Sequence, residues 1–185
     1  FATHTTGGRI YDITYYSLDA LTVDLKPFDA VWASPPCQQF TRAGQQWRKA
    51  GRNYPDLIGP TREALVSAGK PYVVENVVGA PLRNPIILNG ALFNMRVKRD
   101  RLFESNFYIQ QPLLPFQEGG QKMGRPWDAR SGQLFYPVGH FSGVAEARAM
   151  MGIPWMTGEE IAQAVPPVYS EYIWTQTLAH WRHNG

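Results

Sequence analysis

Two apolar stretches decide the fold: DAVWA at residues 29–33 and PYVVENVV at residues 71–78. The first runs into Ser-Pro-Pro at residues 34–36, where the fixed φ and missing N–H of proline end a strand. Between the two stretches, TREALVSA at residues 61–68 predicts a helix, which Gly69 ends because a helix C-terminus favours a left-handed residue. Strand, crossover helix and strand predict a right-handed βαβ unit with parallel strands, and hence an α/β fold.

Shorter elements are predicted along the rest of the chain. Thr157 and Glu160 form a capping-box signature for one short helix, and Gly152 ends the helix before it. Residues 113–137 are rich in Gly, Pro and Gln with little periodicity, so we expect an irregular insert within residues 111–140. The other predicted elements are strands at residues 86–92 and 102–108, a helix at 142–151 capped by Ser142, and a final helix that starts at Pro166-Pro167.

The composition fits one globular domain over residues 1–185. Hydrophobic residues make up 44% of the chain and charged residues 18%, so enough apolar surface is available for a core. The net charge of +3 is a mild cationic bias that favours a polyanionic partner. A single cysteine excludes an internal disulfide, and no apolar run approaches the roughly 20 residues of a membrane span. We therefore expect a protein of a reducing cytoplasm, without metal or membrane contact.

Cys37 and Glu75 are the main candidates for chemistry, because each stands at the end of one of the two predicted parallel strands. Neighbouring parallel strands bring both side chains to the same rim of the sheet, where α/β proteins bind their ligands. There a thiolate could attack a heteroaromatic base while the carboxyl donates or shares a proton. The alternatives are a buried structural cysteine and a surface or helix-capping glutamate.

Two basic segments are candidates for contact with an anion. Residues 38–54 (QQFTRAGQQWRKAGRNY) interleave basic and aromatic side chains and are otherwise polar, as expected of a loop that faces an anion. Residues 99–101 (RDR) place two arginines on one face of an extended segment, where they could pair with phosphate or a base carbonyl. Solvated surface charge is the alternative for the second segment.

Taken in order along the chain, these features resemble the DNA cytosine-5 methyltransferase family, particularly its compact phage-type members. SPPCQ at residues 34–38 resembles that family's motif IV, and ENV at residues 75–77 resembles its motif VI. RDR at residues 99–101 resembles motif VIII, and QAVPP at residues 163–167 approximates motif X. Four motifs in the family's order, spread over residues 19–172, make the resemblance strongly specific.

The resemblance implies transfer of a methyl group from S-adenosylmethionine to C5 of cytosine in double-stranded DNA, on a Rossmann-like class I methyltransferase sheet. Cys37 would add to C6 of a cytosine flipped from the duplex, Glu75 would assist at N3, and Arg101 with Arg99 would hold the base. We expect a monomer in the cytoplasm of a bacterial or phage-infected cell, serving DNA methylation or restriction-modification. The implied DNA contacts are Gln38, Arg42, Arg48, Lys49, Arg52 and Asn76, and the implied cofactor contacts are Asp19, Pro35, Gln163 and Val165.

The sequence departs from the family's pattern in several places. Residues 1–8 do not match the glycine-rich turn of motif I, and Gln163 stands where the family has asparagine. The chain opens on Phe1 rather than Met, so we expect that an upstream segment has been lost and that the sheet is incomplete at its N-terminal side. The short distance from residue 101 to the C-terminal helices predicts a small target-recognition region.

Two other functions stay open. An exocyclic-amino DNA methyltransferase also uses an SPP-type loop, although direct attack by an amino group leaves Cys37 without a role. A non-catalytic DNA-binding remnant of the cytosine-5 family would account for the missing glycine-rich turn.

Overall fold

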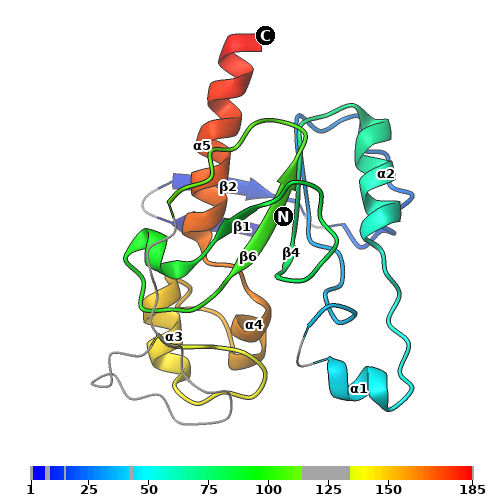
Figure 1. Cartoon of the computed structure of the whole chain (residues 1–185). Coiled ribbons are helices and arrows are strands. Elements are labelled where there is room, and N and C mark those ends of the chain that lie inside the picture. The colour runs from blue at the N-terminus through cyan, green and yellow to red at the C-terminus, as the bar shows by residue number, and fades with distance from the viewer. Residues whose placement is uncertain (1, 7–8, 15, 42–43, 114–133, 185) are drawn as a thin grey trace.

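The computed structural model describes residues 2–6, 9–14, 16–41, 44–113 and 134–184 (Figure 1). At its centre is an open sheet with the strand order β3-β4-β6-β5. β3 and β4 are parallel, and β6 runs antiparallel to both of its neighbours, so the fold is mixed α/β and the predicted α/β class is confirmed. The four strands are β3 (Val31–Ala33), β4 (Tyr72–Val77), β5 (Ile86–Leu88) and β6 (Arg101–Ser105).

The predicted strand, helix and strand are present, and the connecting helix is α2 (Ile58–Ala68). It begins before residue 61, because the Asp56 carboxylate accepts a hydrogen bond of 3.0 Å from the N–H of Ile58 and so satisfies a donor of the first turn. Gly69 ends the helix in the left-handed conformation, with a φ of 65°, as predicted. The parallel pairing of β3 with β4 across this helix is also confirmed.

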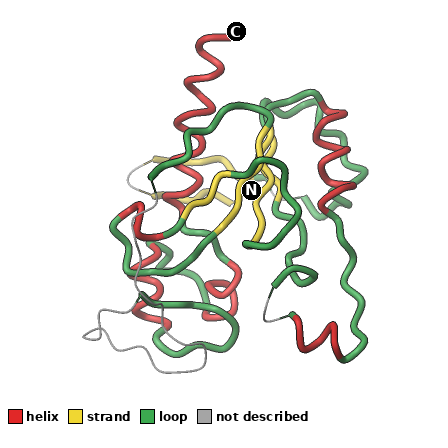
Figure 2. Tube along the Cα trace, in the orientation of Figure 1, coloured by secondary structure: helices red, strands yellow, loops and turns green. Residues whose placement is uncertain are grey.

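Helices cover both faces of the sheet (Figure 1, Figure 2). On one face α2 packs through Leu65 against β4, and on the other α5 (Pro167–Asn184) packs through Tyr169 and Ile173. Successive side chains of a strand point to opposite faces, so β4 directs Val73 and Glu75 toward α5. The core on the α5 side also contains Ile86, Leu88, Phe103, Phe107 and Ile109.

A second hydrophobic core lies around α3 (Val144–Met151) and α4 (Gly158–Gln163). The predicted capping box is confirmed: the Thr157 hydroxyl accepts from the N–H of Glu160, whose carboxylate accepts from the N–H of Thr157. α3 ends at Gly152 as predicted but begins after Gly143, whose φ of 88° redirects the chain, so the expected Ser142 cap is wrong. This core contains Val97, Phe135, Ala147, Met151, Ile153 and Ile161.

Other elements differ from the prediction. The strand expected at residues 86–92 ends at Leu88, because the Asn89 side chain accepts from two amides of the 3-10 helix η1 (Gly90–Phe93). The segment expected to be a loop at residues 38–54 contains α1 (Gln45–Lys49). β1 (Ala2–Thr6) and β2 (Arg9–Ile13) form a separate antiparallel hairpin that sequence reasoning missed. Residues 114–133 of the predicted insert lie outside the described residues.

Among the helices that the structure describes, none has both the length and the apolar character needed to cross a membrane.

Candidate active site

The loop after β3 brings Cys37 to the edge of the sheet at which β4 ends. β3 and β4 pair in parallel, so the chain that leaves β3 runs past the end of β4. The side-chain amide of Asn76 donates to the Pro35 carbonyl at 2.9 Å and fixes this loop to β4. The Cys37 thiol is free and half-buried. The structure therefore places Cys37 beside the strand end that carries Glu75, and the thiol is accessible in part.

The chain after Cys37 folds back in a tight turn. The N–H groups of Phe40 and Thr41 donate to the Cys37 carbonyl at 2.9 and 3.1 Å. Arg48 of α1 closes the turn, since its Nη1 donates to the carbonyls of Gln38 and Thr41 at 2.5 and 3.1 Å. Arg48 thus holds the segment behind the thiol, and its predicted contact with DNA stays a prediction.

Gly44 makes this turn possible. A Cβ at residue 44 would lie 2.3 Å from the Gln38 carbonyl oxygen and 2.7 Å from Nη1 of Arg48, which is too close for any side chain. Sequence reasoning missed Gly44, because a lone glycine in a polar segment does not reveal which backbone will approach it.

Glu75 forms an ion pair with Arg101 of the neighbouring strand. The distance from Glu75 Oε1 to Arg101 Nε is 3.0 Å, and Glu75 is only 7% exposed. Arg101 pairs with Val77 across β4 and β6, so it lies on the same face of the sheet as Glu75. Nη1 of Arg101 also donates to the carbonyl of Asp100 at 2.8 Å. Arg101 therefore lies beside Glu75 at the rim, and its predicted contact with the base stays a prediction.

The charged groups of this rim act on one another. Burial raises the pKa of the Glu75 carboxyl, and the opposing effects come from Arg101, the Ser34 hydroxyl and Arg99. Burial also raises the pKa of the Cys37 thiol, which the charge of Arg101 lowers and the charge of Glu75 raises. Such effects fade with distance, so the thiol, the carboxyl and Arg101 form one electrostatic unit. A carboxyl that retains its proton more readily than usual therefore lies near a nucleophile.

Ser34 is a second residue that sequence reasoning did not single out. Its hydroxyl forms a hydrogen bond with Glu75 and accepts one of 3.2 Å from the indole N–H of Trp32. The available signal was its position: the residue after a parallel strand lies at the ligand-binding rim.

Arg99 lies inside the protein. It is 1% exposed, and its guanidinium donates to four backbone carbonyls of the segments 161–164 and 137. Burial lowers the pKa of Arg99 to about 9, which leaves it charged at neutral pH. The side chain is thus enclosed and bonded within the protein, and the predicted contact of Arg99 with the base stays a prediction.

Asn76 also lies inside the protein. It is 1% exposed, its amide nitrogen donates to Pro35, and its amide oxygen accepts from the N–H of Val77 at 2.9 Å. Both polar ends of the side chain are therefore used inside the protein. In this structure Asn76 positions the loop that carries Cys37, and its predicted contact with DNA stays a prediction.

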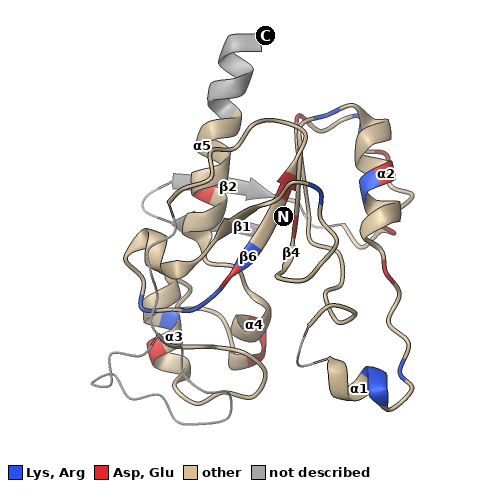
Figure 3. Ribbon diagram, in the orientation of Figure 1, with Lys and Arg blue, Asp and Glu red and all other residues tan. Residues whose placement is uncertain are grey.

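The other predicted DNA contacts lie in and around α1 (Figure 3). Gln38, Lys49 and Arg52 are exposed, and Arg52 stacks over the ring of Trp47 with its Cζ 4.8 Å from the ring centre. This arrangement presents cationic groups beside a half-exposed indole, which suits a nucleic-acid backbone and bases. Arg42 lies outside the described residues.

Three of the predicted cofactor residues lie in segments that adjoin the rim. Pro35 belongs to the loop that Asn76 fixes, and Gln163 and Val165 stand at the end of α4. The carbonyl of Ala164, between the last two, accepts from Nε of Arg99 at 2.9 Å. Arg99 thus holds the main chain of this segment while Gln163 is exposed, and the contacts of Pro35, Gln163 and Val165 with the cofactor stay predictions.

Asp19 is not joined to that segment. Its carboxylate accepts a hydrogen bond of 2.9 Å from the N–H of Leu21 and so closes its own exposed turn. Within the described part of the chain, no hydrogen bond or ion pair links Asp19 to the other predicted cofactor residues. Its contact with the cofactor stays a prediction.

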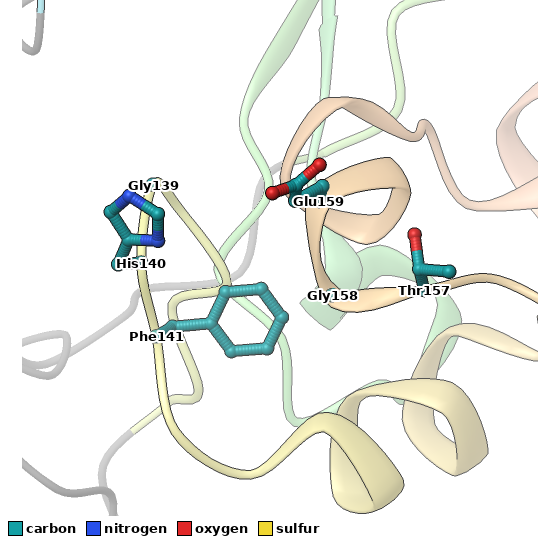
Figure 4. A pocket seen from close by; sticks show the side chains of 6 residues that line it. All are labelled: Gly139, His140, Phe141, Thr157, Gly158 and Glu159. Carbon is teal, nitrogen blue, oxygen red and sulfur yellow. The ribbon is translucent and has the colours of Figure 1, made fainter.

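Two cavities lie away from this rim. One of about 360 Å³ separates the loop 139–141 from the start of α4, with His140 and Phe141 on one side and Glu159 on the other (Figure 4). The second, of about 390 Å³, lies at the opposite end of the sheet and is lined partly by Tyr72 and Glu104. The residues predicted to form the site line neither cavity. The described ranges contain no group of three or more His, Cys, Asp or Glu residues that could hold a metal ion.

Comparison of the sequence with family models gives no match, and comparison with curated proteins gives no match either.

Proposed function

We propose that this chain is the catalytic region of a DNA cytosine-5 methyltransferase, built on a class I methyltransferase sheet. The observation that supports this best is the meeting of Cys37, Glu75 and Arg101 at one rim, with Glu75 and Arg101 3.0 Å apart. The thiol, the acid and the cation are the groups that addition to a cytosine ring requires, and they come from three different strands or strand ends.

Cys37 is the nucleophile in this proposal. Its thiolate forms a bond from Sγ to C6 of cytosine, and the electron pair of the C5–C6 double bond shifts toward N3. N3 takes the proton of Glu75, whose pKa burial has raised. C5 becomes nucleophilic as a result. Once C5 carries the methyl group, its proton passes to water and the electron pair of that C–H bond re-forms the C5–C6 double bond. The bond from Sγ to C6 then breaks with its electron pair on sulfur, which restores the thiolate, and N3 returns its proton to Glu75.

Arg101 acts on both the Cys37 thiol and the Glu75 carboxyl. Its charge lowers the pKa of Cys37 and so favours the thiolate. It also lies 3.0 Å from Glu75, where it stabilises the carboxylate that remains after the proton has passed to N3. When bound, S-adenosylmethionine supplies the electrophilic methyl group, and Pro35, Gln163 and Val165 are the residues proposed to hold it.

Double-stranded DNA is the proposed partner. A cytosine inside the duplex cannot reach a half-buried thiol, so it must leave the base stack. Lys49, Arg52 and Trp47 near the turn behind Cys37 would hold the opened strands. We place the protein, as a monomer, in the cytoplasm of a bacterial or phage-infected cell.

The decisive experiment uses duplex DNA that contains 5-fluorocytosine, because fluorine at C5 cannot leave as a proton and the adduct persists. We expect a covalent complex that needs S-adenosylmethionine, survives denaturation and is absent in Cys37→Ala. Cys37 is the one cysteine of the chain, so the adduct has a single assigned sulfur.

Binding of the same DNA to Cys37→Ala serves as the control. Retained binding without an adduct in the wild-type protein would indicate a DNA-binding remnant. Methyl transfer to the base without an adduct would indicate an exocyclic-amino methyltransferase.

A further inference from the structure

Arg99 bonds to a helix end that would otherwise be unsatisfied. The last carbonyls of a helix have no partner within the helix. At the end of α4, Arg99 donates from Nη2 to Ile161 and Ala162 at 3.3 and 2.7 Å, and from Nε to Ala164 at 2.9 Å. Nη1 donates to Pro137 at 2.9 Å. One buried guanidinium thus bonds the end of α4 and residue 137 to the residues that directly precede β6.

The backbone of residue 99 is held from another direction. Its carbonyl accepts a hydrogen bond of 3.0 Å from the hydroxyl of Tyr169, which lies on α5 and is fully buried. Two residues further along the chain, at the start of β6, Arg101 contacts Glu75. A continuous series of buried contacts therefore runs from the end of α4 through Arg99 and β6 to the rim.

We propose that Arg99 is a positioning residue that couples the segment 161–165 to the rim of Cys37 and Glu75. Binding of a ligand to this segment then changes the reactivity of the Cys37 thiol. The inference rests on the proposed function, which gives Gln163 and Val165 a part in holding S-adenosylmethionine. Movement of the segment relative to β6 would break charged hydrogen bonds in a buried place, and unsatisfied buried charge is costly. The two parts therefore move together.

The charge of Arg99 acts on the same rim. It lowers the pKa of both Cys37 and Glu75, in each case less than Arg101 does. The other groups that act on the two residues are the Ser34 hydroxyl on Glu75 and the carboxylate of Glu75 on Cys37. A neutral side chain at residue 99 should therefore make the thiolate of Cys37 harder to form, which a residue that serves only for packing would not do.

The test compares Arg99→Met with Arg99→Lys and with Arg62→Met, a matched control on the α2 face. Arg62 is 8% exposed and is bound to Glu104, but it is not among the groups that shift the pKa of Cys37. The measurement is the rate of Cys37 alkylation by iodoacetamide against pH, followed by mass spectrometry. We expect Arg99→Met to move the profile to higher pH, so that at a given pH below the midpoint Cys37 is alkylated more slowly than in the wild-type protein.

Arg99→Lys and Arg62→Met should both follow the wild-type profile, since the first keeps the charge and the second lies elsewhere. Coincident profiles for Arg99→Met and Arg62→Met would overturn the proposal. If Arg99→Met does not fold, Arg99→Gln takes its place, because it keeps two N–H donors without a charge.

The coupling itself is measured with S-adenosylhomocysteine as the probe. In the wild-type protein, saturating probe should change the alkylation rate of Cys37. In Arg99→Lys the probe should still bind by calorimetry while its effect on alkylation falls roughly fivefold or more, because an ammonium cannot reproduce the fork of a guanidinium. An undiminished effect in Arg99→Lys would overturn the coupling. If the wild-type protein does not bind the probe, the proposed cofactor role fails, and the pH profiles alone decide whether Arg99 acts on the rim.

Discussion

Two glutamate–arginine pairs lie on adjacent strands of one sheet, and they differ in how the carboxylate is satisfied. Glu104 on β6 accepts from Nε and Nη2 of Arg62 at 2.6 and 2.7 Å, and from the N–H of Arg83 at 2.7 Å. Burial raises the pKa of Glu104, but these donors lower it by more. Glu75 on β4 has the ion pair with Arg101 and the Ser34 hydroxyl, and burial prevails, so its pKa is raised.

The difference lies partly in the number and geometry of the donors and partly in depth, because more of the protein surrounds the Glu75 carboxyl than the Glu104 carboxyl although both are little exposed. Glu104 is 2% exposed and Glu75 is 7% exposed. A bidentate arginine and a backbone amide fix Glu104 as a carboxylate that ties α2 to the sheet. Glu75, with fewer donors, is the carboxyl that can exchange a proton. The same pair of residue types thus serves as a structural tie on one face and as a candidate acid on the other.

The largest expected effect separates the two carboxyls by activity. Glu75→Gln should lower methyl transfer to cytosine by about 10²–10⁴-fold, the usual contribution of a general acid, because the amide has no proton to give N3. Glu104→Gln should leave the rate of the folded protein close to that of the wild type. Incorporation of labelled methyl groups from S-adenosylmethionine into duplex DNA measures both, with Cys37→Ala as the baseline. Equal losses of methyl transfer in Glu75→Gln and Glu104→Gln would show that the two carboxyls do not differ in function.

The next prediction concerns stability, where loss of the pair Arg62 and Glu104 should cost more than loss of the pair Arg101 and Glu75. Arg62→Met should lower the free energy of unfolding by about 3–5 kcal/mol, because it leaves a buried carboxylate without its bidentate partner. Arg101→Met should cost less, about 1–2 kcal/mol, since it breaks a pair with fewer hydrogen bonds and Glu75 takes up a proton readily. Urea denaturation at neutral pH gives both values. A larger loss in Arg101→Met would contradict the assignment of Glu104 as the structural member.

The smallest effect is in the pH dependence of stability, and it has opposite signs for the two carboxyls. The folded-state pKa of Glu75 is raised, so its contribution to stability is present at low pH and is lost as pH rises through that pKa. The pKa of Glu104 is lowered, so its contribution is present above the usual glutamate range and is lost as pH falls through the lowered value.

Relative to the wild type, Glu75→Gln should therefore gain stability as pH rises above the usual glutamate pKa. Glu104→Gln should lose stability, relative to the wild type, as pH rises from acid toward that value. Each pKa unit corresponds to about 1.4 kcal/mol, so denaturation curves between about pH 3 and pH 8 resolve the slopes. Slopes of the same sign in the two variants would show that the carboxyls do not differ as described.

Local features of the fold could be predicted from the sequence. Gly69 and the pair Thr157 and Glu160 act within one turn of the chain, so their neighbours in sequence determine what they do. The parallel pairing of β3 with β4 could also be predicted, because the helix recognised at residues 61–68 makes the connection a crossover. This pairing brings Cys37 to the rim where Glu75 stands.

The roles of Arg99 and Asn76 could not be predicted, because they depend on partners far away in the chain. Arg99 bonds to residues more than 30 positions further along, and the Arg-Asp-Arg pattern around it is equally typical of a solvated surface. Asn76 carried a usable signal: a buried polar residue in an apolar strand needs an internal partner. The neighbouring sequence likewise gives no indication that β6 lies antiparallel between β4 and β5.

That strand order has a consequence for synthesis. β6 follows β4 and β5 in the chain but lies between them, so both strands expose an unpaired hydrogen-bonding edge on the ribosome until residues 101–105 have emerged. Arg101 arrives with the same strand. The nascent protein therefore acquires Arg101, the partner of Glu75, at the step that joins β4 and β5 through β6. A chain that ends before residue 101 has neither the paired strands nor the complete rim.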